Sequence, residues 1–371
     1  MLKTLKVNNF TVFDNVEFEF SPGLNVIVGE NGAGKTHVLK LGYLFSRAWP
    51  DLTSERLAVN NDRVESYLEK RLADLFQVND LSALLKFRSK GGASIEAHMS
   101  WLVSSTKIPM PWKVEIQQRG HKTKLSVLEF TLDVMYARER GASFPHQVLV
   151  PSKEIVSLFN GFIGIYDKYK NFPLDVSYRD LVAAMSTLEL RDSPSLMSNA
   201  VQRMQGLLDG ELKLEKGELV FERRDGSLMG IPLMAEGYRK LAMLIYLLRY
   251  GVIERGATLF WDEPESNLNP AALKLLAEAL YTLANSDVQV VVATHSLFLL
   301  REFEILQTRS LHDRSSALPC RYFGLGRQEN NGSVTVSQGA DVADINPLIL
   351  LDENLLQSDR YMAAESLHDR D

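Results

Sequence analysis

The hydrophobic and polar positions along the chain change period several times, which predicts a mixture of strands and helices. Residues 1–20 alternate in the manner of two strands joined by a short turn, most clearly where Val16, Phe18 and Phe20 are separated by glutamates. Four further apolar runs are short and continuous: 24–28, 148–150, 258–261 and 288–293. Continuous runs of this length are typical of strands buried on both faces of a mixed or parallel sheet.

Apolar residues at helical spacing fill much of the chain between these runs. Residues 51–90 are amphipathic, residues 152–208 are mostly helical with two breaks, and a strongly apolar helix runs from about residue 234 to residue 250. Residues 93–135 instead predict an antiparallel meander, and residues 211–222 predict a hairpin. This alternation of strand and helix signals predicts an α/β fold with an added antiparallel sheet and helical insertions.

Composition narrows the class of protein. The chain has 371 residues, 45% of them hydrophobic, and its one cysteine, Cys320, excludes a disulfide framework and a cysteine zinc site. No signal-peptide pattern opens the sequence and no apolar run reaches the length of a membrane span, so we expect a cytoplasmic protein with no membrane partner. The net charge of −6 argues against a generic nucleic-acid binder. A local basic cluster at residues 119–124 is either a solvated hairpin tip or a contact for nucleic acid or protein.

A glycine-rich loop joins the run at 24–28 to the helix that follows it. Residues 29–36, Gly-Glu-Asn-Gly-Ala-Gly-Lys-Thr, match the pattern G-x-x-x-x-G-K-[ST], whose backbone N–H groups and helix N-terminus cradle nucleotide phosphates. Lys35 is expected to reach the β- and γ-phosphates, and Thr36 to hold Mg²⁺. The predicted nucleotide-binding residues of this loop are Asn31, Gly32, Ala33, Gly34, Lys35, Thr36 and His37.

Two later strands end in residues that suit phosphate chemistry. The third apolar run ends in Asp262 and Glu263, the Walker B pattern, and the fourth ends close to His295. Because the carboxyl ends of parallel strands meet at one edge of a sheet, we expect Asp262 to hold Mg²⁺ together with Thr36. Glu263 would be the general base for the attacking water, and His295 would contact the γ-phosphate or that water. The residues predicted to be catalytic are Lys35, Glu263 and His295.

The order of these motifs resembles that of the ABC-type ATPase heads. Residues 9–13, Asn-Phe-Thr-Val-Phe, and residues 262–270, Asp-Glu-Pro-Glu-Ser-Asn-Leu-Asn-Pro, make the chain similar to the stand-alone bacterial RecF-like, OLD-like and Septu-type defence and repair ATPases (the AAA_21 and AAA_15 types). The resemblance covers about residues 1–340. It implies a P-loop NTPase fold of the ABC type, ATP and Mg²⁺ as ligands, and ATP hydrolysis.

The resemblance also implies a division of the chain into parts. The expected parts are an N-terminal part of the ATPase head at 1–50 and 93–150, a helical insertion at 51–92, a helical lobe and hairpin at 151–232, a C-terminal part of the head at 233–340 and a helical tail at 341–371. Gln147 is the candidate for the glutamine of the family's Q-loop. The sequence contains no long heptad run, so the coiled-coil arms of the SMC and Rad50 relatives are not expected.

In this family two heads face each other, and ATP lies between the P-loop of one head and the signature segment of the other. Residues 234–238, Met-Ala-Glu-Gly-Tyr, take the place of the family's Leu-Ser-Gly-Gly-Gln, so Gly237 is expected to lie against the nucleotide of the second head. Ala235 and Glu236 depart from the pattern. The serine hydroxyl is missing, and Glu236 would repel a phosphate unless it pairs with a basic residue of the same helix.

The favoured hypothesis is an ATPase that forms a homodimer or higher oligomer and switches a separately encoded nuclease or toxin, in antiviral defence. It follows from the resemblance and from two absences in the sequence: no Toprim-like acidic domain follows residue 301, and no His-Asn-His nuclease pattern occurs. A RecF-like ATPase that binds DNA directly in repair is the first alternative. A scaffold that binds ATP but hydrolyses it weakly is the second, because the signature segment is altered.

Overall fold

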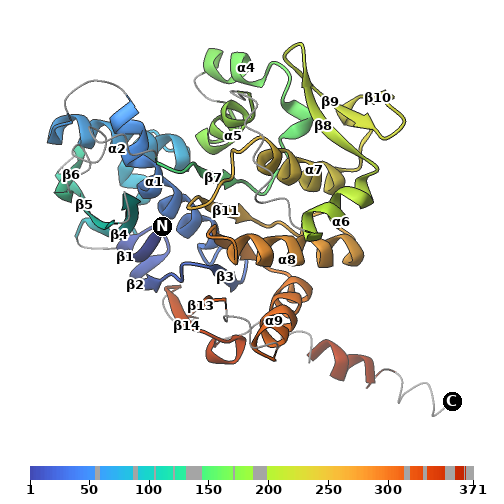
Figure 1. Cartoon of the computed structure of the whole chain (residues 1–371). Coiled ribbons are helices and arrows are strands. Elements are labelled where there is room, and N and C mark those ends of the chain that lie inside the picture. Colours follow the sequence, from blue (N-terminus) through green and yellow to red (C-terminus); the bar gives the residue numbers. More distant parts are fainter. Residues whose placement is uncertain are drawn as a thin grey trace.

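The structure is a computed structural model, drawn in Figure 1. It describes residues 1–54, 59–86, 91–103, 106–119, 122–130, 144–169, 172–186, 199–312, 318–328, 332–346, 356–362 and 364. The strands of the described chain form one large sheet and one small sheet, with helices packed against the large sheet. This is the mixed α/β architecture of a P-loop ATPase head, as the sequence predicts.

The large sheet has eleven described strands. Across the sheet they are β6 (Lys122–Phe130), β5 (Thr106–Arg119), β4 (Ala93–Val103), β1 (Leu2–Phe10), β2 (Phe13–Glu19), β14 (Val334–Gly339), β13 (Cys320–Arg327), β3 (Leu24–Gly29), β12 (Gln289–Thr294), β11 (Thr258–Asp262) and β7 (Gln147–Val150). The strands from β13 to β7 run parallel to one another. Their carboxyl ends therefore open on the same edge of the sheet.

The two faces of the parallel strands are covered by different helices. Along β11, Leu259 and Trp261 face a core that contains α7 (Glu236–Arg249) and α8 (Pro270–Ala284), whereas Phe260 faces a core that contains α1 (Lys35–Ser54). All five residues of β11 are buried. Burial on both faces explains why these strands are continuous apolar runs in the sequence.

The antiparallel part of the sheet is made of hairpins. β1 pairs with β2 and β4, and β5 pairs with β4 and β6. One face is covered by α2 (Asn61–Phe76), whose buried residues Val64, Leu68, Leu72 and Leu75 are spaced three or four apart. The predicted meander and amphipathic helix are both present in the described residues, while the meander's tip at 120–121 and residues 131–134 lie outside them.

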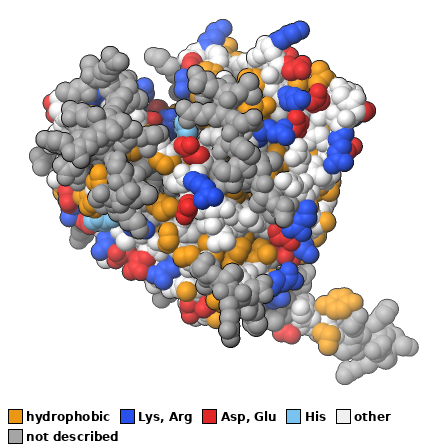
Figure 2. Space-filling model, viewed as in Figure 1, with side chains coloured by type: hydrophobic (Ala, Val, Ile, Leu, Met, Phe, Trp, Pro, Cys, Tyr) orange, Lys and Arg blue, Asp and Glu red, His pale blue; other side chains and the backbone are white. Residues whose placement is uncertain are grey.

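The outer face of the antiparallel part carries mixed charge. Lys6 lies 3.2 Å from Glu17, and Lys113 lies 2.7 Å from Glu96. Figure 2 likewise shows acidic and basic side chains interspersed over the described surface in that view. Neighbouring charges of opposite sign cancel at a distance, so this face does not form a uniform basic field.

A helical lobe lies beside β7 and α7 (Figure 1). It contains α4 (Phe162–Lys168), α5 (Val176–Ser186), α6 (Asn199–Leu208) and the small sheet β8 (Gly210–Glu215), β9 (Glu218–Arg223) and β10 (Leu228–Met229). The helical prediction for 152–208 and the hairpin prediction for 211–222 are confirmed where the chain is described. After β12, α9 (Leu297–His312) leads to the β13–β14 hairpin.

Two element boundaries differ from those predicted. From Thr36 onward the sequence predicts a helix that ends at about Ala48, but α1 continues to Ser54 with Pro50 inside its last turns. Burial of Trp49 and Leu52 stabilises those turns, and it outweighs the hydrogen bond that a proline cannot donate. The strand that the sequence predicts to end in Asp262 and Glu263, β11, stops at Asp262, because the positive φ of Glu263, 48°, departs from extended strand geometry. Among the described helices, none combines the length and the apolar character needed to cross a bilayer.

Candidate nucleotide site

The glycine loop between β3 and α1 closes over its own lysine. The Lys35 ammonium group donates hydrogen bonds to the carbonyl oxygens of Gly29, at 2.7 Å, and Glu30, at 2.9 Å. Burial lowers the pKa of Lys35, although nearby carboxylates oppose that shift. The side chain is thus held within the loop, at the start of α1, where the sequence places the phosphates.

Gly34 needs glycine both for its backbone conformation and for its packing. Its φ is +90°, and a Cβ atom there would lie 2.6 Å from the ring of Phe13 and 2.7 Å from the side chain of Val12. Gly32 also has a positive φ, of 79°, but no atom lies within 4 Å of the place of its Cβ. Residues 9–13 therefore pack directly under the phosphate loop, which gives that short segment a structural reason to accompany the loop.

His37 faces the same segment and not the mouth of the loop. Its Nδ1 lies 2.9 Å from the hydroxyl of Thr11, and its ring packs edge-on against Phe76. Burial lowers the pKa of His37 to about 4, so the ring is neutral at pH 7. Any contact of this residue with a phosphate would come from its backbone N–H in the first turn of α1.

The two predicted metal ligands meet across the sheet. The hydroxyl of Thr36, on α1, donates a 2.8 Å hydrogen bond to a carboxylate oxygen of Asp262, at the end of β11. Burial raises the pKa of Asp262 to about 6, against the hydrogen bond from Thr36 and the charge of Lys35. A hydroxyl and a carboxylate are the hard oxygen ligands that Mg²⁺ takes from a protein when phosphates and water supply the rest, so these residues fit that ion.

Glu263, the predicted general base, is held in a strained conformation. Its φ of 48° lies in the left-handed region, where a non-glycine residue costs on the order of 1–3 kcal/mol. Its N–H donates to the carbonyl of Ala293 on β12, and its own carbonyl accepts hydrogen bonds from Ser266 and, at 3.3 Å, from the ammonium group of Lys240. These bonds, to β12, to α7 and within the turn itself, fix the turn and leave the carboxylate one-third exposed at the edge of the sheet.

His295 lies at the same edge. Its Nδ1 is 3.5 Å from Glu263 Oε1 and 3.4 Å from Glu265 Oε1, and its side chain is 47% exposed. The structure thus brings Lys35, Thr36, Asp262, Glu263 and His295 to the carboxyl ends of β3, β11 and β12. The sequence predictions did not assign a part to Glu265, although its place in the Asp-Glu-Pro-Glu run signalled one.

The signature-like segment packs against the turn that follows Glu263. A Cβ atom at Gly237, in the first turn of α7, would lie 2.2 Å from the carbonyl oxygen of Asn267. Of the two basic residues that the sequence allowed as partners of Glu236, Lys240 lies close enough for the charge of Glu236 to oppose the lowering of its pKa by burial. Arg239 pairs instead with Glu154, at 2.9 Å.

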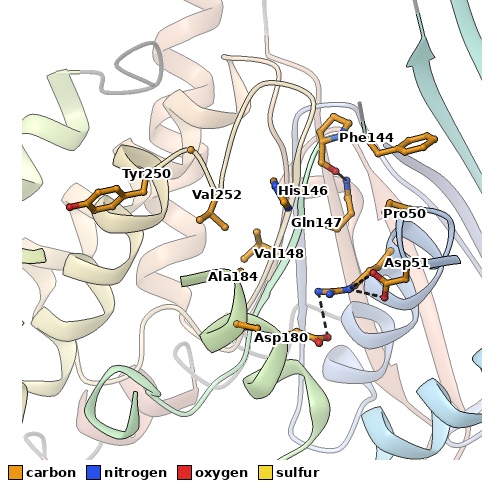
Figure 3. A pocket seen from close by; sticks show the side chains of 14 residues that line it. Pro50, Asp51, Phe144, His146, Gln147, Val148, Asp180, Ala184, Tyr250 and Val252 are labelled. Carbon is orange, nitrogen blue, oxygen red and sulfur yellow. Dashed lines mark hydrogen bonds and ion pairs between the residues drawn. The ribbon is translucent and has the colours of Figure 1, made fainter. Parts of the chain in front are cut away.

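Gln147 was the candidate for the Q-loop glutamine, and the structure contradicts this. Gln147 begins β7, opposite Thr258 at the start of β11, so it lies four residues, or about 13 Å of strand, away from the edge that carries Asp262. Its side-chain amide donates to the carbonyl of Pro145 and lines a separate cavity of about 530 Å³, beside Arg47 and Asp180 (Figure 3).

The residue that follows β7 at the correct edge is Ser152. Together with Thr36, Tyr178 and Asp262 it lines a small cavity of about 140 Å³ next to the predicted metal site. The sequence signal for Ser152 is its position after a short apolar strand and a proline.

Comparison with known proteins agrees with this geometry. A family model described as "AAA domain, putative AbiEii toxin, Type IV TA system" matches residues 152–301, and one described as "AAA domain" matches residues 4–126. The OLD nuclease of Thermus scotoductus is 23% identical over 312 residues, which are 80% of this chain and 59% of that protein. A DNA replication and repair protein RecF from Listeria monocytogenes is 25% identical over 174 residues, 47% of this chain and 37% of that protein.

Together these matches support an ABC-type ATPase of the RecF/OLD family. The chain is also similar to an ATP/GTP phosphatase of Helicobacter pylori, at 20% identity over 89% of this chain and 93% of that protein.

Among solved structures, an Smc head bound to the C-terminal domain of ScpA from Pyrococcus furiosus has a TM-score of 0.55 at 14% identity, covering 97% of this chain and 99% of that one. An Smc head bound to the C-winged helix domain of ScpA has a TM-score of 0.54 at 15% identity, covering 91% and 97%. At these identities the likeness is one of fold. The chain spans 59% of the OLD nuclease and 37% of the RecF protein that it matches.

Proposed function

We propose that this ATPase binds Mg²⁺ and ATP at the edge formed by β3, β11 and β12 and hydrolyses the ATP there. The observation that carries the proposal is the 2.8 Å hydrogen bond between Thr36 and Asp262, with the carboxylate of Glu263 and the ring of His295 on the same edge. The phosphate loop, the metal ligands and a general base come from separate parts of the chain. Their meeting at one place is what P-loop hydrolysis requires.

Each residue has a distinct part in the reaction. Lys35 and the N–H groups of the loop bind the phosphates, and Thr36 and Asp262 would hold the Mg²⁺, which neutralises phosphate charge. Glu263 accepts a proton from the attacking water, whose oxygen forms the new bond to the γ-phosphorus. The bond to the bridging oxygen breaks, and ADP leaves with that oxygen. His295 donates a hydrogen bond to the γ-phosphate or the water.

We further propose that two heads pair, as homodimer or higher oligomer, so that the signature-like segment of one faces the nucleotide of the other. The fold of Smc heads supports this arrangement. Glu236 is exposed and is not paired with Arg239, so it presents a negative charge on that segment. Pairing of the heads would then be weaker than in relatives that carry the usual serine and glycine, and the switch would depend more strongly on the metal and on salt.

The biological output would be control of a separate nuclease or toxin in the cytoplasm, in antiviral defence. The similarity to an OLD nuclease and to a family described by a toxin name supports this output. Closure of the heads on ATP would expose or hide the surface that the effector binds, and hydrolysis would reset it.

Two variants test the catalytic part. Lys35→Ala should lose ATP binding, because the only ammonium group inside the loop is removed. Glu263→Gln should bind ATP like the wild type, lose about 10²-fold or more in turnover, and accumulate as the paired form. Binding is measured with a fluorescent ATP analogue, turnover by phosphate release, and pairing by light scattering. Equal turnover in the three proteins would contradict the assignments.

A second experiment tests the output. Co-expression with the neighbouring gene products should give nuclease activity or toxicity that depends on ATP and is changed by Glu263→Gln. The absence of any ATP-dependent effect on any neighbour would rule this output out while leaving the ATPase assignment intact.

The similarity to RecF proteins favours one other function, direct ATP-dependent binding of DNA in repair. It predicts a DNA affinity that rises with ATP and falls steeply with salt. The mixed charge on the outer sheet face is a poor match for a phosphate backbone. DNA affinity that changes with neither ATP nor salt would remove this alternative.

A further inference from the structure

A third carboxylate, Glu265, lies behind the proposed active site. It follows Glu263 by two residues in the turn after β11, and its side chain is only 7% exposed. A buried carboxylate is costly unless it accepts hydrogen bonds or faces a counterion. The contacts of Glu265 therefore indicate why the chain keeps a charge there.

One oxygen of Glu265 holds the end of the neighbouring strand. Its Oε1 accepts a 2.6 Å hydrogen bond from the Thr294 hydroxyl and a 3.0 Å hydrogen bond from the backbone N–H of His295. The Thr294 hydroxyl in turn accepts the N–H of Ser296, at 2.9 Å. The backbone on both sides of His295 is thus tied to a single carboxylate oxygen.

The same oxygen faces the ring of His295. Nδ1 lies 3.4 Å from Glu265 Oε1, and since Nδ1 faces the carboxylates, Nε2 is the nitrogen on the opposite, outer side of the ring. A carboxylate beside one ring nitrogen fixes the tautomer and the orientation of an imidazole. Catalytic hydrogen bonds are often long before substrate binds and shorten in the complex.

A basic residue of α7, the helix that begins in the signature-like segment, lies near the carboxylate of Glu265. Lys240, which is 1% exposed, lies near Glu265 and donates to the carbonyl of Glu263 at 3.3 Å. The other oxygen of Glu265, Oε2, is buried and accepts no hydrogen bond from the described residues. Glu265 is therefore held between α7 and the end of β12, and its Oε1 is committed to the loop of His295.

We infer that Glu265 is the positioning residue of His295: it fixes the Thr294–Ser296 turn and the imidazole ring, so that Nε2 faces the γ-phosphate. This role deepens the proposed ATPase function and rests on it. Glu265 itself touches neither the nucleotide nor the attacking water, so its removal acts through His295.

A double-mutant cycle tests the coupling. Glu265→Asp keeps the charge beside Lys240 but withdraws the oxygen by one methylene group. It should lower kcat about 10-fold or more with KM for ATP nearly unchanged, as orienting partners commonly do. In a His295→Ala background the same change should cost less than about 2-fold, because the residues act as a unit. Glu265→Gln keeps an acceptor oxygen and should retain kcat within about 5-fold of the wild type.

A measurement without turnover makes the test independent of the ATPase reaction. In protein labelled with ¹⁵N-histidine and without nucleotide, the ring of His295 should be an Nδ1–H tautomer in the wild type and should lose that preference in Glu265→Asp. His295→Ala identifies its signals. Glu304→Gln, which changes an exposed carboxylate on α9, is the matched control and should alter neither readout.

The inference is overturned if Glu265→Asp lowers kcat equally in both backgrounds, or leaves kcat and the His295 tautomer unchanged. Those results would leave the proposed ATPase function standing. A wild-type protein without ATP hydrolysis would instead end the proposed function, and the tautomer measurement would still decide the part played by Glu265.

Discussion

Asp262→Asn should stabilise the nucleotide-free protein. Burial raises the pKa of Asp262 from 3.8 to about 6, so the folded state favours the neutral acid. Stability is therefore lost as the pH rises through this window, because the buried group must ionise while the unfolded chain ionises freely. The full shift corresponds to about 3 kcal/mol, and the asparagine, which resembles the neutral acid, avoids that cost.

The dependence on pH is the informative part of this prediction. The variant should exceed the wild type in unfolding free energy by about 1.5 kcal/mol at pH 5 and about 3 kcal/mol at pH 7.5, measured by urea unfolding. Mg²⁺ and ATP should reverse the order, since they stabilise the wild type by binding its carboxylate. Asp287→Asn, at an exposed turn, should show neither effect. A difference that is flat with pH, or of opposite sign, would refute the reasoning.

Three further predictions concern glycine packing and His37. Gly34→Ala should abolish ATP binding and should cost more stability than Gly32→Ala, because both glycines have a positive φ but only Gly34 lies against Phe13. Thermal unfolding compares the two variants, and an equal loss of stability would contradict this prediction. Gly237→Ala should destabilise the protein and reduce turnover, measured by calorimetry and phosphate release, unlike a change at an open helical glycine. The wild type should lose about 2 kcal/mol of unfolding free energy between pH 8 and pH 5, because a lowered histidine pKa makes stability fall as pH falls, and His37→Gln should remove this loss. Urea unfolding at both pH values measures it. An equal loss in the variant would count against a buried neutral ring.

The sequence predicts the residues that take part in the chemistry of the site better than it predicts the contacts that hold them in place. Asp262 could be placed because a continuous apolar run that ends in an acid implies the carboxyl end of a buried strand. The same rule excludes Gln147, which lies at the start of its strand and so belongs to the opposite end. The extension of α1 past Pro50 depends on the burial of Trp49 by β5 and β6, and contacts so distant in sequence leave no local pattern.

The sequence does not reveal the positioning role of Glu265, for a related reason. Two carboxylates in one acidic run look alike in sequence, but the left-handed φ of Glu263 turns them to different surroundings. Glu263 becomes one-third exposed beside His295, whereas Glu265 becomes buried under Thr294. The backbone conformation that separates them is set by hydrogen bonds to β12 and α7, neither of which is adjacent in the chain.

The same carboxyl edge contains three acids in four residues, and the fold handles each one differently. Burial raises the pKa of Asp262 to about 6, Glu263 is one-third exposed beside His295, and Oε1 of Glu265 accepts hydrogen bonds from Thr294 and His295. Ionisation of Asp262 therefore costs free energy in the nucleotide-free protein, whereas the carboxylate of Glu263 is open to solvent. On the proposed function, Mg²⁺ bound by Asp262 would offset that cost and would also complete the phosphate site. Binding of the metal and folding of this edge would then be coupled, and Asp262→Asn removes that coupling free energy.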